Sequence, residues 1–243
     1  MSTSGYVPVT LPSRGLLYDG QIPEGEIAIR KPTVVEEVKI QSSGDLINTY
    51  MSSCVKLPNN FPHQKLTVDD RMSTLVALRI HTFGAEYGYN YHCQACGEFQ
   101  KDVCDLIADT ETIVAEDDFA EPIEVQLPDS GKRVGLRFLR GEDEAAIRRD
   151  NSRETGTGTI TTMVLQLLTI DGEDVADVKK RSQNTAFVKA LTVLDMLAWN
   201  NALSDKAVGA KLVVRPECKA CGHMHEMGLP VAADFFRPTR RPG

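Results

Sequence analysis

Cys93-Gln94-Ala95-Cys96-Gly97 and Cys218-Lys219-Ala220-Cys221-Gly222 are two copies of the pattern C-x-A-C-G, more than a hundred residues apart. Each copy predicts a tight turn that points two thiols the same way, and the glycine after the second cysteine lets the backbone fold under a metal ion. Since a closed structural zinc site takes four ligands, each turn supplies half of one site. The pattern therefore predicts a split zinc ribbon, in which distant parts of the chain meet around a single ion.

The predicted ligands are four thiolates that hold one structural zinc per chain: Cys93, Cys96, Cys218 and Cys221. Three other interpretations stay open. The thiols could lie without a metal in a packed core. A thioredoxin-like redox pair is less favoured because that motif begins a helix, whereas strand-like sequence flanks these turns. Catalytic zinc is also disfavoured because it keeps an open position for water, and four thiolates leave none.

Several residues near the turns are candidates for substitute ligands or for contacts around the metal. They are His92, Cys104, His223 and His225. Cys104 is more typical of a small buried hydrophobic residue, and the histidines are more typical of solvated side chains. A four-thiolate zinc centre carries two negative charges, which nearby cations are expected to offset; these are Lys101, Arg215 and Lys219.

Length and composition narrow the class of protein. The chain has 243 residues, a formal net charge of -7 and six cysteines. The negative charge disfavours nucleic-acid binding, which depends on attraction to phosphates. The sequence contains no apolar run of about 20 residues and begins without the features of a signal peptide, so we expect no membrane segment and a cytoplasmic origin. Free thiols in that compartment favour metal binding over disulfides.

Periodicity predicts an α+β fold. Two short strands are expected around residues 7–12 and 27–30, followed by a helix that begins with the capping box of Thr33 and Glu36. Further helices are expected over residues 46–57 and 67–83, with Gly84 ending the second. Alternating tyrosines then lead into the first cysteine turn, which predicts that the turn is the tip of a β-hairpin.

After an acidic linker at 116–122, the pattern begins again. Residues 123–131 resemble residues 7–15, and Val134-Gly135-Leu136-Arg137 resembles Ile27-Ala28-Ile29-Arg30. Helices are expected from the apolar spacing at 160–168 and at 187–198, and the second cysteine turn follows. The order predicts an internal duplication, in which residues 1–115 and 123–243 each run strand, strand, helices and zinc knuckle. Chance likeness between short turns is the alternative.

The sequence contains no recognised catalytic motif: no G-x-S-x-G elbow, no Walker-type phosphate loop and no H-E-x-x-H helix. Gly156-Thr157-Gly158-Thr159 could cradle an anion, but without a following lysine it more simply begins a helix. We therefore predict that the chain is not an enzyme. At the C-terminal end, adjacent aromatics precede a basic tail, and the candidate interaction residues are Phe235, Phe236 and Arg237. The rings either close the chain's own core or anchor a neighbouring subunit.

The chain resembles the T-even-type phage baseplate proteins, a family of baseplate hub subunits and hub-assembly proteins. The resemblance rests on Leu11-Pro12-Ser13-Arg14-Gly15-Leu16-Leu17-Tyr18, on the helix, tyrosine strand and turn that end at Gly97, and on Phe235-Phe236-Arg237-Pro238. It implies a structural or assembly role in the hub or wedge of a contractile tail, with other baseplate or tail proteins as partners. The expected location is the host cytoplasm during assembly, and the virion baseplate if the protein is retained.

The resemblance implies no small-molecule substrate. Two alternatives from other classes remain. The first is a zinc-ribbon nucleic-acid-binding or transcription-related module, which strong and salt-sensitive DNA binding would support. The second is a thiol-dependent enzyme, which rapid labelling of a low-pKa cysteine at neutral pH would support.

Overall fold

The structure is a computed structural model that describes residues 5–153, 156–229 and 233–236. It is α+β, as the sequence predicts. The helices are α1 (Val34–Ser43), α2 (Leu46–Cys54), α3 (Val68–Phe83), α4 (Asp143–Arg153), α5 (Thr157–Gln166), α6 (Arg181–Ala190), α7 (Val193–Asp205) and α8 (Ala233–Phe236). The strands are β1 (Val7–Thr10), β2 (Glu26–Ile29), β3 (Val55–Lys56), β4 (Glu86–His92), β5 (Phe99–Asp105), β6 (Glu111–Ile113), β7 (Ile123–Gln126), β8 (Arg133–Leu136), β9 (Leu167–Ile170), β10 (Glu173–Asp174), β11 (Gly209–Lys211), β12 (Val213–Val214) and β13 (Met227–Gly228).

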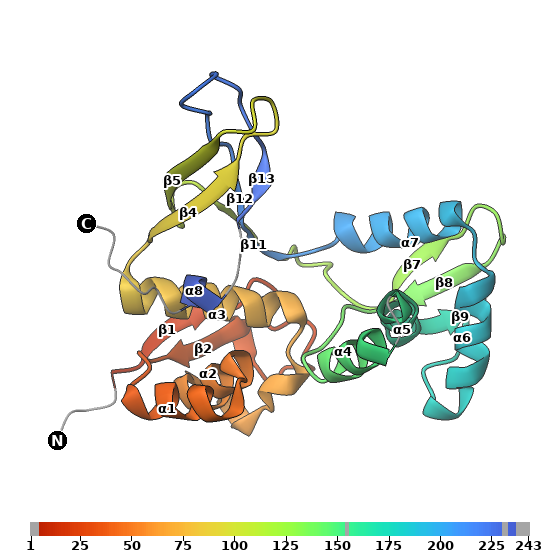
Figure 1. Ribbon diagram of the computed structural model, residues 1–243. Coiled ribbons are helices and arrows are strands. Elements are labelled where there is room, and N and C mark those ends of the chain that lie inside the picture. Colours follow the sequence, from red (N-terminus) through yellow and green to blue (C-terminus); the bar gives the residue numbers. More distant parts are fainter. Residues whose placement is uncertain (1–4, 154–155, 230–232, 237–243) are drawn as a thin grey trace.

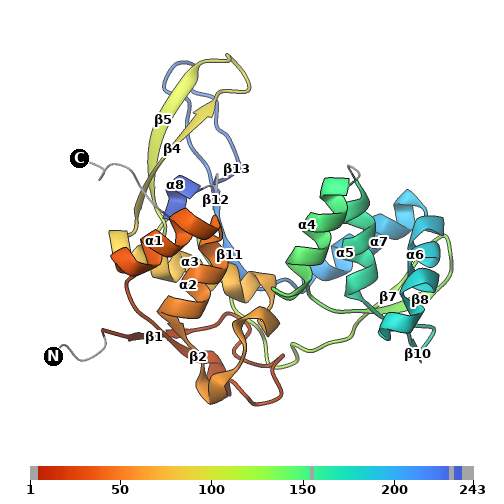
Figure 2. The same ribbon diagram turned by 60° about the horizontal axis from the view of Figure 1, so that its bottom comes forward.

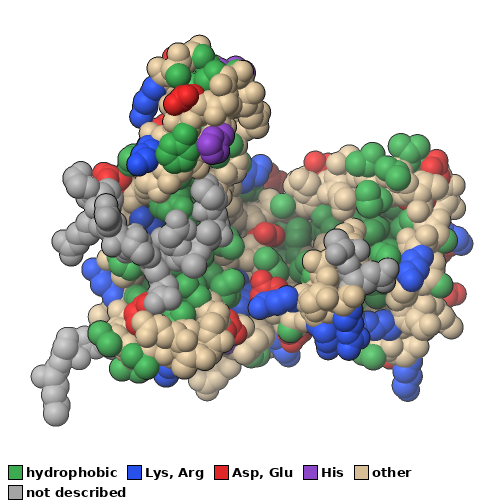
Figure 3. All heavy atoms as spheres, in the orientation of Figure 1, with side chains coloured by type: hydrophobic (Ala, Val, Ile, Leu, Met, Phe, Trp, Pro, Cys, Tyr) green, Lys and Arg blue, Asp and Glu red, His purple; other side chains and the backbone are tan. Residues whose placement is uncertain are grey.

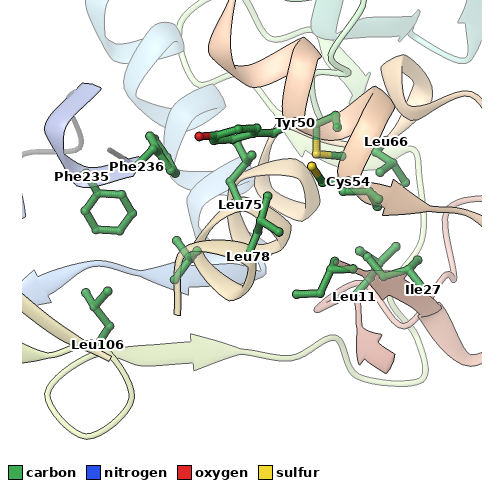
Figure 4. Close-up of a cluster of buried hydrophobic side chains, with 14 of the residues drawn as sticks. Leu11, Ile27, Tyr50, Cys54, Leu66, Leu75, Leu78, Leu106, Phe235 and Phe236 are labelled. Carbon is green, nitrogen blue, oxygen red and sulfur yellow. The ribbon is translucent and has the colours of Figure 1, made fainter. Parts of the chain in front are cut away.

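Two lobes lie side by side, and the strands β4, β5, β12 and β13 project from the first lobe (Figures 1 and 2). In the first lobe, β1, β2 and β3 form an antiparallel sheet, with α1, α2 and α3 beside it. Leu11, Leu75, Leu78 and Phe235 contribute to one buried cluster between these elements (Figure 4). Burial of such apolar side chains is the main favourable contribution to the lobe's stability.

The start of α1 has the capping box that its sequence predicts. The Thr33 side chain accepts a hydrogen bond from the backbone of the first turn, and the Glu36 carboxylate accepts one from the Thr33 backbone N–H at 2.7 Å. Arg30, directly after β2, pairs with the same carboxylate at 2.9 Å. The hydrogen bond from Arg30 is the largest of the causes that lower the pKa of Glu36 to about 2.

Replacing Glu36 with glutamine should therefore flatten part of the pH dependence of stability. Between about pH 4.5 and pH 2 the folded wild-type protein binds fewer protons at Glu36 than the unfolded chain, so its stability falls as the pH falls. At neutral pH we expect Glu36→Gln to cost on the order of 2 kcal/mol of unfolding free energy. Urea unfolding at several pH values should show this difference shrinking toward pH 2. A difference that stays constant down to pH 2 would contradict the assignment.

The second lobe surrounds a four-stranded antiparallel sheet in the order β10-β9-β8-β7. Helices α4 to α7 pack around it, and Trp199 of α7 is fully buried in the second apolar cluster. The Trp199 indole N–H donates a hydrogen bond to the Gln166 side chain at 3.1 Å, which satisfies the ring's polar atom inside the core.

Two expected helices differ in this lobe. The apolar spacing at 160–168 predicted a helix through Leu168, but α5 ends at Gln166 and Leu167 begins β9, because this segment pairs with β8. The spacing at 187–198 predicted one helix, but the structure has α6 and α7. α6 ends at Ala190 because Leu191 has an extended conformation, and Thr192 caps the start of α7 by accepting a hydrogen bond from the Asp195 backbone N–H.

The two lobes share an order of elements. In each, two antiparallel strands are followed by two helices and then by a third strand that pairs with the second. The backbone N–H that follows the second strand donates to the end of the second helix in both lobes, from Arg30 to Cys54 at 2.9 Å and from Arg137 to Gln166 at 2.8 Å.

Side chains repeat as well. Arg137 pairs with Asp143 six residues later at 2.8 Å, just as Arg30 pairs with Glu36, and both carboxylates also accept a backbone N–H from three residues upstream. In both lobes, an arginine directly after the second strand therefore forms an ion pair with a carboxylate in the first turn of the next helix. The Arg140 backbone N–H is the donor in the second lobe, at 2.7 Å.

A second matched feature joins a later helix to an early turn. The Thr67 side chain caps α3 by accepting a hydrogen bond from the backbone N–H of Asp70. In the same way, the Thr192 side chain caps α7 by accepting one from the backbone N–H of Asp195. Asp70 then accepts hydrogen bonds from the backbone N–H and hydroxyl of Ser13 after β1, and Asp195 accepts backbone N–H groups from the turn after β7. Both aspartates are fully buried, so these donors satisfy carboxylates that have no access to water.

The lobes also contact each other directly. The Val68 backbone N–H donates to the Leu139 carbonyl at 2.9 Å, and the buried Arg71 guanidinium pairs with Glu144 at 2.5 Å. A Cβ at Gly141 would lie 1.9 Å from an Arg71 guanidinium nitrogen, so a glycine lets the second lobe approach this closely. The join between the lobes thus does not depend on the cysteine turns.

The chain leaves the first lobe at β6 and returns at β11, and these two strands pair with each other. The buried apolar residues from Ala115 to Val208 belong to the second apolar cluster, whereas Val214, Leu229, Phe235 and Phe236 belong to the first. The residues predicted as a second half, 123–243, are therefore shared between two cores. The predicted linker is also packed, because Phe119 is buried in the second cluster.

Candidate metal centre

Both cysteine turns have the same backbone geometry. In the first turn, the Cys93 N–H donates to the Glu98 carbonyl at 2.9 Å and the Gly97 N–H donates to the Cys93 carbonyl at 2.8 Å. The second turn repeats both bonds at the same lengths around Cys218. Gly97 and Gly222 have φ of 75° and 74°, a left-handed conformation that glycine adopts without steric cost. The repeated C-x-A-C-G pattern therefore specifies two equal turns.

The turns bring four sulfur atoms together. The Sγ atoms of Cys93 and Cys221 lie 3.7 Å apart, and those of Cys96 and Cys218 lie 3.8 Å apart. All four lie within 4.8 Å of one another. A tetrahedron with metal–sulfur bonds of about 2.3 Å has sulfur–sulfur edges of roughly 3.8 Å. The four thiols are thus spaced to surround one metal ion.

Packing between the hairpins sets this spacing. The alternating tyrosines of β4 turn one face inward, and the Tyr91 ring lies edge-on to the buried His225 ring at 5.2 Å. Across the same interface, the Lys219 backbone N–H donates to the side chain of buried Gln100 at 3.3 Å. The sequence prediction of a turn at a hairpin tip is confirmed for the first pair, where β4 and β5 pair along their whole length.

The environment favours an ionised thiol at one position. Burial acts to raise the pKa of Cys93, but hydrogen bonds from the backbone N–H groups of Cys96 and Ala95 and from His225 bring that pKa down to about 5. The hydrogen bond from the His223 backbone acts to lower the pKa of Cys221, but burial and hydrogen bonds with the other three thiols together raise that pKa to about 12. Four thiols this close cannot all ionise without a cation among them.

Two of the three nearby cations, Arg215 and Lys219, have partners of their own. Arg215 pairs with Glu226 at 2.9 Å, and the Lys219 amine lies 3.6 Å from the Asp102 carboxylate and donates to the Lys101 carbonyl. The hydrogen bonds to the sulfurs come instead from backbone N–H groups and from His225. Backbone N–H groups of the turns and the His225 side chain therefore add positive potential at the sulfurs.

The substitute ligands lie outside the cluster. Cys104 is buried in the first core, and burial raises its pKa to about 11, as it does for Cys54. His92 is exposed beside the Phe99 ring, and His223 is also exposed. His225 was expected to be solvated, but its side chain is buried against the Tyr91 ring. In the sequence, only the alternation of His223 and His225 indicated that one of the two histidines could be buried. Alternation alone does not identify which face is buried.

Phe235 and Phe236 lie in the chain's own core. The Phe235 ring is fully buried and contacts the Tyr87 ring edge-on at 4.8 Å, and the Arg79 guanidinium lies 5.7 Å from its centre. The third candidate interaction residue, Arg237, lies outside the described residues. Of the two alternatives for the aromatic pair, the structure has the one in which the rings close the core.

Fold and site together define an α+β protein with two lobes and a four-thiol cluster between two hairpin tips. The family model of the T4 bacteriophage base plate protein matches residues 15–237. This match covers most of the chain, so the chain belongs to the T4 bacteriophage base plate protein family. Comparisons with curated proteins and with solved structures give no match. Among the helices that the structure describes, none has the length and apolar content to cross a membrane.

Proposed function

We propose that the protein is a structural or assembly component of a contractile-tail baseplate, in its hub or wedge, and that one structural zinc holds its projecting hairpins in place. The family match supports the baseplate role. The observation that carries the zinc proposal is the approach of four sulfurs to within 4.8 Å from two segments that are far apart in the sequence. The partners are other phage baseplate or tail proteins, first in the host cytoplasm and then, if the protein is retained, in the virion tail.

Zinc is the metal that this site suits best. Four thiolates in a tetrahedron are typical of zinc or iron–sulfur centres, and a single ion with two C-x-x-C turns is typical of structural zinc. Cys93, Cys96, Cys218 and Cys221 would occupy every coordination position. Such a site binds no water to activate, so it stabilises the fold and supplies no reaction.

The zinc ribbon in this proposal consists of the β4–β5 hairpin and the shorter β12–β13 pair. The metal lies at their tips, and Tyr91 and His225 pack together below it. The ion would fix the direction in which the hairpins leave the first lobe. Since the lobes already contact each other through Val68 and Arg71, the metal orients the hairpins more than it joins the cores.

The proposal includes an internal duplication. Its support is the shared order of strands and helices, the matched Arg30 and Arg137 ion pairs, the matched Asp70 and Asp195 hydrogen bonds and the equal cysteine turns. The repeated bonds at equal spacing support a duplication over chance likeness of short turns. Each copy then contributes one knuckle to a shared site.

The outer face of the projecting hairpin is the surface that we assign to subunit contacts. Phe99 and Val103 lie on the face of β5 away from the core and are 47% and 54% exposed, respectively. Exposed aromatic and aliphatic side chains beside a rigid metal turn are typical of a protein interface. Zinc would make this face rigid before a partner binds.

Metal analysis of the purified chain tests the zinc proposal. We expect inductively coupled plasma mass spectrometry to find one zinc per chain in the wild-type protein and almost none in Cys96→Ser. Two zinc ions per chain, or none in freshly purified wild-type protein, would contradict a shared site. Electron microscopy of an assembled tail tests the baseplate role, because a protein absent from every tail structure and every assembly intermediate cannot act there.

A further inference from the structure

A surface cavity of about 290 Å³ lies between α4, α5 and α6 in the second lobe. Three cationic side chains line it: Arg153 at the end of α4, Arg181 at the start of α6 and Lys189 near the end of α6. Asp150 is the one carboxylate among the lining residues. The cavity thus has an excess of positive charge, although the whole chain has a net charge of -7.

The carboxylate in the cavity has hydrogen-bond and ion-pair partners, whereas the three cations differ from it in this respect. Asp150 already accepts a hydrogen bond from the Thr161 hydroxyl at 2.9 Å and pairs with Arg149 at 3.5 Å. The side chains of Arg153, Arg181 and Lys189 have no ion pair with any residue in the described part of the chain. Asp150 attracts Arg153, but the three cations outnumber this one carboxylate, so an anion placed among them would reduce their mutual repulsion.

The walls of the cavity are built by close packing of α4 against α5. A Cβ at Gly158 would lie 2.9 Å from the Cβ of Asn151, so a glycine allows this approach. The first turn of α5 has no side-chain cap and no acidic residue, and Thr157 in that turn lines the cavity. Ile160 and Val164 of α5 add apolar surface to the same cavity.

We propose that this cavity binds an acidic segment of a neighbouring tail protein. Its carboxylates would meet Arg153, Arg181 and Lys189, and an apolar side chain of the same segment would pack on Ile160 and Val164. Charge complementarity favours this occupant, because guanidinium and ammonium groups bind carboxylates with charge-assisted hydrogen bonds. This proposal rests on the proposed baseplate function only in naming a tail protein as the partner that carries the acidic segment.

The shape of the charged region distinguishes a peptide from nucleic acid. Figure 3 shows Lys and Arg side chains gathered over α4, with Asp and Glu side chains elsewhere on the same face. A duplex contacts a long basic stripe with many phosphate-binding groups, whereas this cavity holds three cations around an apolar wall. A short segment with both carboxylate and apolar side chains matches that combination.

Fluorescence anisotropy with the full chain tests the proposal. The probe is a fluorescein-labelled octapeptide that alternates glutamate and leucine, and its twin has glutamine in place of each glutamate. The test variant is Arg181→Gln with Lys189→Gln. The matched control is Arg148→Gln with Lys179→Gln, which removes the same charge from exposed cations of the same lobe that do not line the cavity. Circular dichroism melting verifies that both variants fold.

We expect the acidic peptide to bind the wild-type chain and the control with similar affinity, and the test variant to bind roughly tenfold more weakly or worse. The glutamine peptide should bind weakly to all three, and salt should weaken binding of the acidic peptide. Equal losses in test and control variants, or no peptide binding, would overturn the proposal. Duplex DNA or inorganic phosphate that binds the cavity more tightly than the peptide would overturn it too. Zinc content is measured without peptide, so either result leaves the metal proposal standing.

Discussion

Removal of the metal is expected to release the projecting hairpins while both lobes stay folded. Structural zinc supplies on the order of 10 kcal/mol of binding free energy in small zinc peptides. Near the sulfurs the hairpins meet through Tyr91 with His225 and through Lys219 with Gln100, Lys101 and Asp102, which are polar or ring contacts weaker than four metal–sulfur bonds. After chelation, hydrogen exchange should therefore lose protection in β4, β5, β12 and β13 and keep it in the buried strands of the second lobe.

Two cysteine variants distinguish the effect of losing a metal ligand from the effect of losing a buried side chain. Cys96→Ser should behave like the chelated protein, since Cys96 is exposed and its loss removes a ligand without leaving a cavity. Cys104→Ala should keep one zinc and lose only about 1–2 kcal/mol of unfolding free energy, because it removes one buried sulfur from the first core. Hairpins that stay protected in metal-free Cys96→Ser protein would show that the metal does not hold them.

Replacement of Trp199 with alanine is expected to cost about 3–5 kcal/mol of unfolding free energy. The side chain is fully buried in the second core, and its loss also leaves the Gln166 side chain without the indole N–H. Leu197→Ala on the exposed face of the same helix is the control, and should cost less than about 1 kcal/mol. Because the chain has one tryptophan, urea unfolding is followed by circular dichroism. Equal costs for the two variants would show that Trp199 is not a core residue.

Local signals in the sequence predicted a large part of the fold. Thr33 with Glu36 predicted the start of α1, and Gly84 predicted the end of α3, since a capping box and a terminal glycine act within one helical turn. The cysteine turns were also predictable, because the C-x-A-C-G pattern specifies a backbone that needs no distant contact. The approach of the two turns to each other was predicted only from the four ligands that a structural zinc ion requires.

The features that the sequence did not predict depend on distant partners. Leu167 was expected in a helix because its apolar spacing fits one, but pairing with β8 makes it a strand residue. The break before α7 has a local signal, Thr192 followed by Asp195, which the apolar spacing across it concealed. The burial of His225 depends on Tyr91, more than a hundred residues earlier, so no pattern near the histidine predicts it.

The sequence also did not predict how the chain is divided between the two apolar clusters. Apolar residues after Val208 look like those before it, and only the pairing of β6 with β11 sends the last strands back to the first lobe. The cationic cavity shows the same limit, since Arg153 and Lys189 lie on helices that pack through a third helix between them.

The order in which the cysteines occur along the chain has a consequence for biosynthesis. Cys96 leaves the ribosome 122 residues before Cys218, which is a delay of roughly 6–24 s at ordinary rates of translation. Throughout that interval the nascent β4–β5 hairpin exposes two unligated thiols, and the second lobe is made and can fold before the site can close. Capture of a metal by all four thiols would therefore have to wait until the second lobe and the second cysteine turn have been made.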